Sequence, residues 1–178
     1  MFLNILVALD ASASARRALE QAVDLARAGN AKLTLMTVAP PTSTYVTLAG
    51  VGLDTMIEEL DKWAKDVLDD AMRTIPDDVV AHTVQARGHP GPKILGELER
   101  GGYDLIVLGS RGRGRAQEGL LGSVNGYIHF HAKVESTVGI MNGSRMNARV
   151  SALPRKCRLS SIASQRPSAS LKIVVTAV

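Results

Sequence analysis

Short, almost continuous apolar runs recur along the first 109 residues of the chain. Such runs are typical of strands that are buried on both faces of a parallel sheet. They occupy residues 3–9, 33–38 and 103–109, and a looser alternation of apolar and polar positions covers 79–86. The pattern therefore predicts four strands.

The segments between these runs carry apolar residues at helical spacing, three and four positions apart. They predict helices over 15–29, where Gly29 and Asn30 are typical stop residues, and over 53–71, with Pro76 closing the segment. A shorter helix, entered through prolines, is predicted within 88–102. The prolines and glycines within 39–52 predict a loop.

Strands and helices thus alternate with short connections. This order is typical of βαβ crossovers, which build a parallel sheet with helices on both faces. We therefore predict a Rossmann-like α/β fold. In such folds, ligands bind beyond the carboxyl ends of the strands.

The character of the chain changes after Val134. Residues 1–134 carry 14 Lys and Arg against 16 Asp and Glu, whereas 135–178 carry 7 basic residues against Glu135 alone. We therefore predict a domain over 1–134 and a separate basic, serine-rich tail over 135–178. The apolar run 171–178 either forms a strand that completes the sheet or pairs with another chain.

Composition narrows the classes of function. No apolar run approaches the roughly 20 residues that span a bilayer, and the N-terminal run lacks the basic start of a secretory signal. A single cysteine, Cys157, cannot form an internal disulfide, which favours a cytoplasmic location. Only 3% of the residues are aromatic, so nucleic acid is a candidate partner for the basic tail alone, through weak contacts.

The clearest candidate chemistry lies directly after the buried apolar residues 105–108. Gly109 and Gly112 are separated by two residues, and nine more residues precede the pair Gly122 and Ser123. Glycines let backbone amides approach a ligand closely, and the free amides of a helix that begins at Gly122 favour a phosphate. The Ser123 hydroxyl adds a further hydrogen-bonding group. The spacing matches neither the P-loop nor the dinucleotide fingerprint, so we interpret it as a different phosphate site.

Other polar residues admit two interpretations each. Asp10 follows the first strand, where it either holds ribose hydroxyls or a divalent ion on the phosphates, or caps the next helix. Arg111 either neutralises phosphate charge or belongs to a solvated loop, and for Arg113 and Arg115 we favour the loop. His129 and His131 lie two positions apart, which on a helix points them to different faces and argues against a shared metal ion.

Several segments of the chain resemble those of a known family. With the opening ILVALDAS, the second strand LTLMTVAP, YDLIVLGSRGRG and GLLGSVNGYIHFHAKV, the sequence over 3–134 resembles the universal stress proteins. It resembles specifically the branch with the Gly-2x-Gly-9x-Gly-Ser ATP motif. The resemblance implies the strand order 3-2-1-4. It also implies nucleotide contacts by Asp10, Val38, Gly109, Gly112, Gly122, Ser123 and Val124. To these we add Arg111, because its charge could neutralise a phosphate.

The resemblance implies an ATP-binding stress-response or signalling module in the cytoplasm, a homodimer, and Mg²⁺ or Mn²⁺ bound through the nucleotide near Asp10. Two alternatives remain. One is a slow ATPase or self-phosphorylating enzyme, with Ser110 or Ser123 as phosphate acceptor. The other is a nucleotide-free interaction module that uses its basic tail. Family members continue from the last helix into a fifth strand, which here is missing, degraded or supplied by 171–178.

Overall fold

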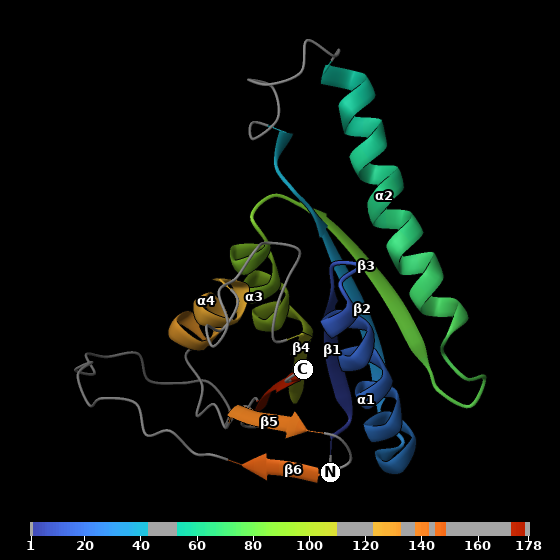
Figure 1. Cartoon of the computed structure of the whole chain (residues 1–178), viewed down its shortest axis with the longest axis vertical. Coiled ribbons are helices and arrows are strands. Elements are labelled where there is room, and N and C mark those ends of the chain that lie inside the picture. Colours follow the sequence, from blue (N-terminus) through green and yellow to red (C-terminus); the bar gives the residue numbers. More distant parts are fainter. Residues whose placement is uncertain are drawn as a thin grey trace.

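The computed structural model describes residues 2–42, 53–109 and 123–132, and the backbone of three further strands. The described parts of the chain form eleven helices and strands, which Figure 1 labels in sequence order. They are β1 (Asn4–Leu9), α1 (Ala13–Gly29), β2 (Lys32–Ala39), α2 (Leu53–Arg73), β3 (Ala81–Arg87), α3 (Pro90–Gly101), β4 (Leu105–Gly109), α4 (Ser123–His131), β5 (Val138–Asn142), β6 (Arg145–Ala148) and β7 (Lys172–Thr176).

The strands form one sheet in the order β3-β2-β1-β4-β7-β5-β6. β1 lies between β2 and β4 and runs parallel to both, and β2 runs parallel to β3. This arrangement confirms the predicted α/β fold with the strand order 3-2-1-4. The position beside β4 is occupied by β7, which runs parallel to it, while β5 and β6 form an antiparallel pair further out.

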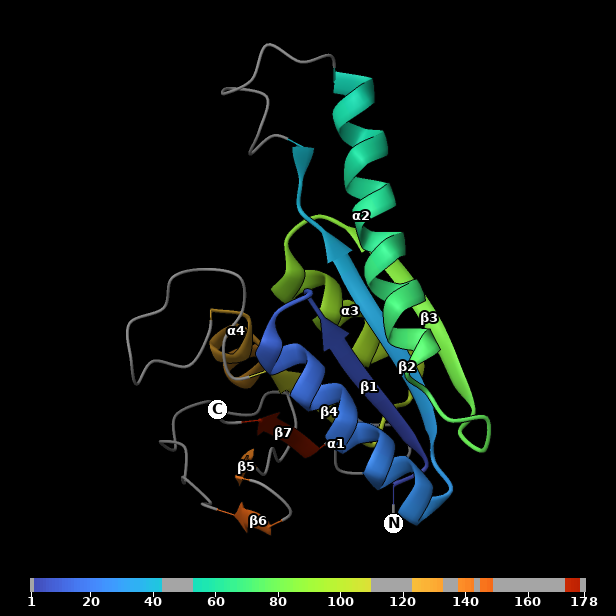
Figure 2. The same ribbon diagram turned by 45° about the vertical axis from the view of Figure 1, so that its right-hand side comes forward.

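Two apolar layers cover the sheet, one on each face. Side chains alternate along β1, so that Ile5 and Val7 face one layer and Leu6 faces the other. The first layer is closed by α1 and α2, and the second by α3 and α4 (Figure 2). β1, β2 and β4 are mostly buried on both faces, which is why their sequences are almost continuous apolar runs. Within the described residues, no helix combines the length and apolar character needed to cross a membrane.

The ends of α1 follow from local sequence. Ser12 is the N-cap, and its side chain accepts a hydrogen bond of 3.1 Å from the Ala15 amide. Asn30 adopts a left-handed conformation with φ of 50° and donates its backbone N–H to Ala26 O. The predicted stop at Gly29 and Asn30 is confirmed.

Helices α3 and α4 pack closely where α3 carries a glycine. A Cβ on the buried Gly91 would lie 2.6 Å from Cδ1 of the Tyr127 ring, whereas a Cβ on Gly96, in the same helix, would meet nothing within 4 Å. Gly91 is therefore required by the contact between the two helices, and Gly96 is not.

This difference predicts opposite effects for the same substitution. Gly91→Ala should lower the free energy of unfolding by about 1–3 kcal/mol, because the new methyl group overpacks the Tyr127 contact. Gly96→Ala should raise it by up to about 1 kcal/mol, since alanine is the better helix former. Urea denaturation of the two variants measures both effects, and equal destabilisation would contradict this account of the α3–α4 contact.

Candidate functional site

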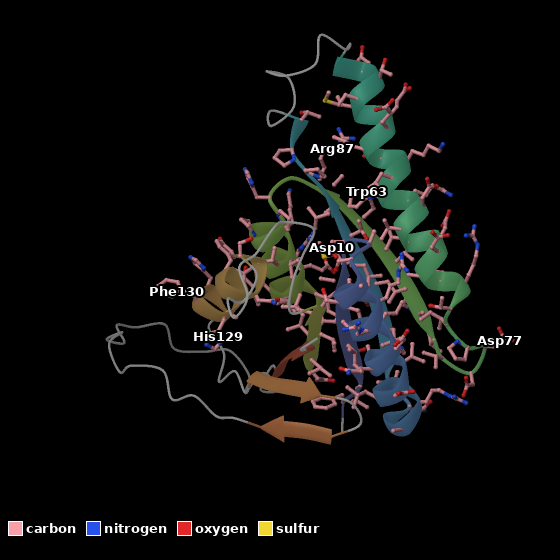
Figure 3. The ribbon with its side chains drawn as sticks, viewed as in Figure 1. Asp10, Trp63, Asp77, Arg87, His129 and Phe130 are labelled. Atoms are coloured by element: carbon pink, nitrogen blue, oxygen red, sulfur yellow. The ribbon has the colours of Figure 1, made fainter. Side chains whose placement is uncertain are left out.

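The carboxyl ends of β1, β2 and β4 meet at one edge of the sheet. In register, Leu9 of β1 pairs with Thr37 of β2, and Ala8 pairs with Leu108 of β4. Asp10 follows directly at the end of β1, where Figure 3 shows it between the two layers of helices. Parallel pairing therefore brings together strand ends that lie about a hundred residues apart in the sequence.

A pocket of about 130 Å³ opens at this edge. It lies at the strand ends, bounded by the first turn of α1 and by α3 and α4. Its described lining comprises Ala8, Leu9, Asp10, Ala15, Met36, Val38, Pro90, Ile94, Leu108, Gly109, Ser123, Val124 and Asn125.

Five of the residues singled out from the sequence line this one pocket: Asp10, Val38, Gly109, Ser123 and Val124. They come from three strand ends and from the start of α4. The other three, Arg111, Gly112 and Gly122, lie outside the described residues, as does Ser110. The structure thus brings the described part of the set together, while the role of each residue stays a prediction.

Asp10 belongs to a tight turn between β1 and α1. Its Oδ1 accepts a hydrogen bond of 3.1 Å from the Ser12 backbone N–H, an Asx-turn, and the intervening Ala11 has φ of 64°. Since Ser12 is the N-cap, capping of α1 does not account for Asp10. The turn holds a half-buried carboxylate at the pocket mouth.

Gly109 is required by the protein itself. A Cβ at this position would lie 2.8 Å from Ser14 Oγ and 2.9 Å from the Ala15 backbone nitrogen. The end of β4 therefore lies directly against the first turn of α1, at a distance that only glycine permits. This packing explains Gly109 without a ligand, although the same residue lines the pocket.

Asn125 is a pocket residue that the sequence interpretation missed. It is almost completely buried, and its Nδ2 donates a hydrogen bond of 2.8 Å to Gly109 O. This bond ties the first turn of α4 to the end of β4 and satisfies a carbonyl at the strand end. The sequence shows only a polar residue in the first turn of a helix, between Val124 and Gly126. That signal is too weak to identify Asn125 as a pocket residue.

The inner wall of the pocket is apolar. Met36 and Val38 from β2, Ile94 from α3 and Leu108 from β4 are all buried. Pro90 sits in the first turn of α3, as the sequence predicted for a helix entered through prolines. An apolar wall with a few polar groups at one side is typical of small-molecule pockets.

His131, the last residue of α4, is held by Tyr127. His131 stacks on the Tyr127 ring with centroids 4.0 Å apart and donates from Nδ1 to Tyr127 O at 2.9 Å. Across the part of the chain that the structure describes, no three His, Cys, Asp or Glu side chains gather into a group able to hold a metal ion.

The chain is similar to characterised sequences and structures. A model described as the Universal stress protein family matches residues 1–138. The universal stress protein YxiE of Bacillus subtilis (strain 168) is 34% identical over 133 residues, which cover 70% of this chain and 90% of YxiE.

Two solved structures share the fold. The universal stress protein UspA from Lactobacillus plantarum is 28% identical, with a TM-score of 0.59 over 72% of this chain and 91% of that protein. A universal stress protein family protein from Arabidopsis thaliana, solved with AMP bound, is 21% identical, with a TM-score of 0.54 over 74% of this chain and 86% of that protein.

The Asn125 contact gives a testable prediction. Asn125→Ala should lower the free energy of unfolding by about 1–3 kcal/mol, because it leaves the Gly109 carbonyl without its donor. Ser123→Ala, two residues earlier and exposed, should change it by less than about 0.5 kcal/mol. Chemical denaturation measures both. An Asn125→Ala variant as stable as the parent would show that the bond does not hold α4 in place.

Proposed function

The chain belongs to the universal stress protein family, and from that membership we propose that it binds an adenine nucleotide, ATP with Mg²⁺ or Mn²⁺, in the pocket at the ends of β1, β2 and β4. It acts as a nucleotide-dependent stress-response module in the cytoplasm. The observation that carries the proposal is the convergence of Asp10, Val38, Gly109, Ser123 and Val124 on one pocket.

The lining suits the parts of such a ligand. Met36, Val38, Ile94 and Leu108 offer an apolar wall for the flat base. The Asp10 carboxylate accepts hydrogen bonds from ribose hydroxyls. Ser123 begins α4, so its hydroxyl and the first amides of that helix favour a phosphate. AMP bound to the Arabidopsis relative supports an adenine nucleotide as the ligand class.

The divalent cation fits the same lining. Mg²⁺ is usually bound by one or two carboxylates together with substrate phosphates. Asp10 is the carboxylate among the described lining residues. When bound, the cation would neutralise phosphate charge, and the chain would supply Asp10 as its one described protein ligand.

We propose binding rather than turnover as the activity. The described lining provides walls and hydrogen-bonding groups, with Ser123 as a hydroxyl near the expected phosphates. The homodimer implied by the family resemblance stays a prediction.

Asp10 provides the test. Isothermal titration calorimetry of the full chain with ATP and Mg²⁺ should give a micromolar Kd, about −8 kcal/mol. Asp10→Asn should weaken binding at least tenfold, by about 1.4 kcal/mol, because the neutral amide loses the charge that holds ribose or cation. The same titration with AMP and without Mg²⁺ separates the contact of Asp10 with ribose from its contact with the cation. AMP lacks the β- and γ-phosphates that hold the ion, so only the ribose contact is tested.

Asp24→Asn is the matched control, because Asp24 is an exposed carboxylate on α1 away from the pocket lining. Its affinity for ATP should equal that of the parent. Absence of binding by the folded parent chain would refute the proposal, and so would an Asp10→Asn variant with undiminished affinity.

A further inference from the structure

A second cavity, of about 330 Å³, lies on the other face of the sheet. α1 packs on β1 and β4 while α2 packs on β2 and β3, and both helices cover the same face (Figure 2). The cavity occupies the groove between them. Its described lining comprises Leu9, Ala11, Ala15, Arg16, Leu19, Glu20, Val67, Asp70, Ala71 and Thr74.

The cavity exists because small side chains meet there. Ala15 on α1 and Ala71 on α2 are both buried, and neither reaches across the space between the helices. Leu19 and the half-buried Val67 complete the apolar floor. The volume is at the lower end of the range for small-molecule pockets, so the space suits a small apolar group.

The rim carries charges of both signs. Arg16 and Glu20 lie one helical turn apart on α1, so both side chains can contact the same ligand. Both are exposed. Within the described chain, neither side chain takes part in a hydrogen bond or an ion pair. The remaining polar groups are already engaged: Asp70 pairs with Arg73, and the Thr74 hydroxyl donates to Ala71 O at 2.7 Å.

We propose that this groove binds a free α-amino acid with a branched aliphatic side chain. The aliphatic group fills the space between Ala15 and Ala71, the carboxylate pairs with Arg16, and the ammonium pairs with Glu20. A ligand with a single charge would pair with only one of these side chains. A carboxylate paired with Arg16 would lie near the like-charged Glu20, and an ammonium paired with Glu20 would lie near the like-charged Arg16. The two opposite charges of the rim therefore favour a zwitterion.

The inference is independent of the nucleotide proposal and is tested without nucleotide. L-leucine is titrated into the ¹⁵N-labelled full chain, and amide shifts are followed by NMR. Saturable shifts are expected for residues 15–20 and 67–74. Isopentylamine, which is leucine without its carboxylate, and 4-methylpentanoate, which lacks the ammonium, should each bind at least threefold more weakly.

Substitutions at three positions test the assignment of residues. Arg16→Gln and Glu20→Gln should each weaken leucine binding at least threefold, and both change exposed side chains that the fold does not need. Ala71→Leu should abolish the shifts by filling the groove, with Ala71→Val as a smaller filling change should the leucine variant not fold. Arg17→Gln is the matched control, because Arg17 is also exposed and is not among the described residues that line the cavity.

Several results would overturn the inference. These are the absence of saturable shifts in the folded parent, shifts centred on Asp10 and Ser123 instead, equal binding of the two singly charged analogues and leucine, or an equal loss of affinity in Arg17→Gln and Arg16→Gln.

Discussion

The contact between the end of β4 and the first turn of α1 is the constraint on which the site depends. Gly109 lies so close to Ser14 and Ala15 that a Cβ would come within 2.8–2.9 Å of their atoms. Its carbonyl is in turn held by Asn125 from α4. Gly109 thus positions β4 against α1, and through its carbonyl it positions α4 against β4. The mouth of the pocket is built from these three elements.

The turn between β1 and α1 adjoins both cavities of this part of the molecule. Leu9 and Ala15 line the pocket at the strand ends and also the groove between α1 and α2. Among the residues that the structure describes, the pocket is lined by one carboxylate and an apolar wall, while the groove has an apolar floor and a rim with both signs of charge. The two cavities differ in chemistry because different side chains face each of them.

Glycines of one motif need not share one role. Gly109 is the first glycine of the Gly-2x-Gly-9x-Gly-Ser spacing, yet its close approach to α1 requires a glycine whether or not a ligand binds. A loss of binding in a Gly109 variant would therefore report on packing as well as on ligand contact. Asp10 is the cleaner probe, since its carboxylate is held by a local turn and capping of α1 belongs to Ser12.

The sequence by itself determined the type and order of the elements from β1 to β4, because a strand buried on both faces and an amphipathic helix each leave a distinct periodic pattern. It also identified Asp10 and Gly109 as strand-end residues, since Asp10 follows the run 3–9 and Gly109 follows the apolar residues 105–108. Only the tertiary structure decided which strand lies beside β4, because the apolar run 171–178 could equally complete the sheet or pair with another chain. The role of Asn125 and the groove between α1 and α2 likewise depend on distances between residues far apart in the chain. No local pattern encodes such distances.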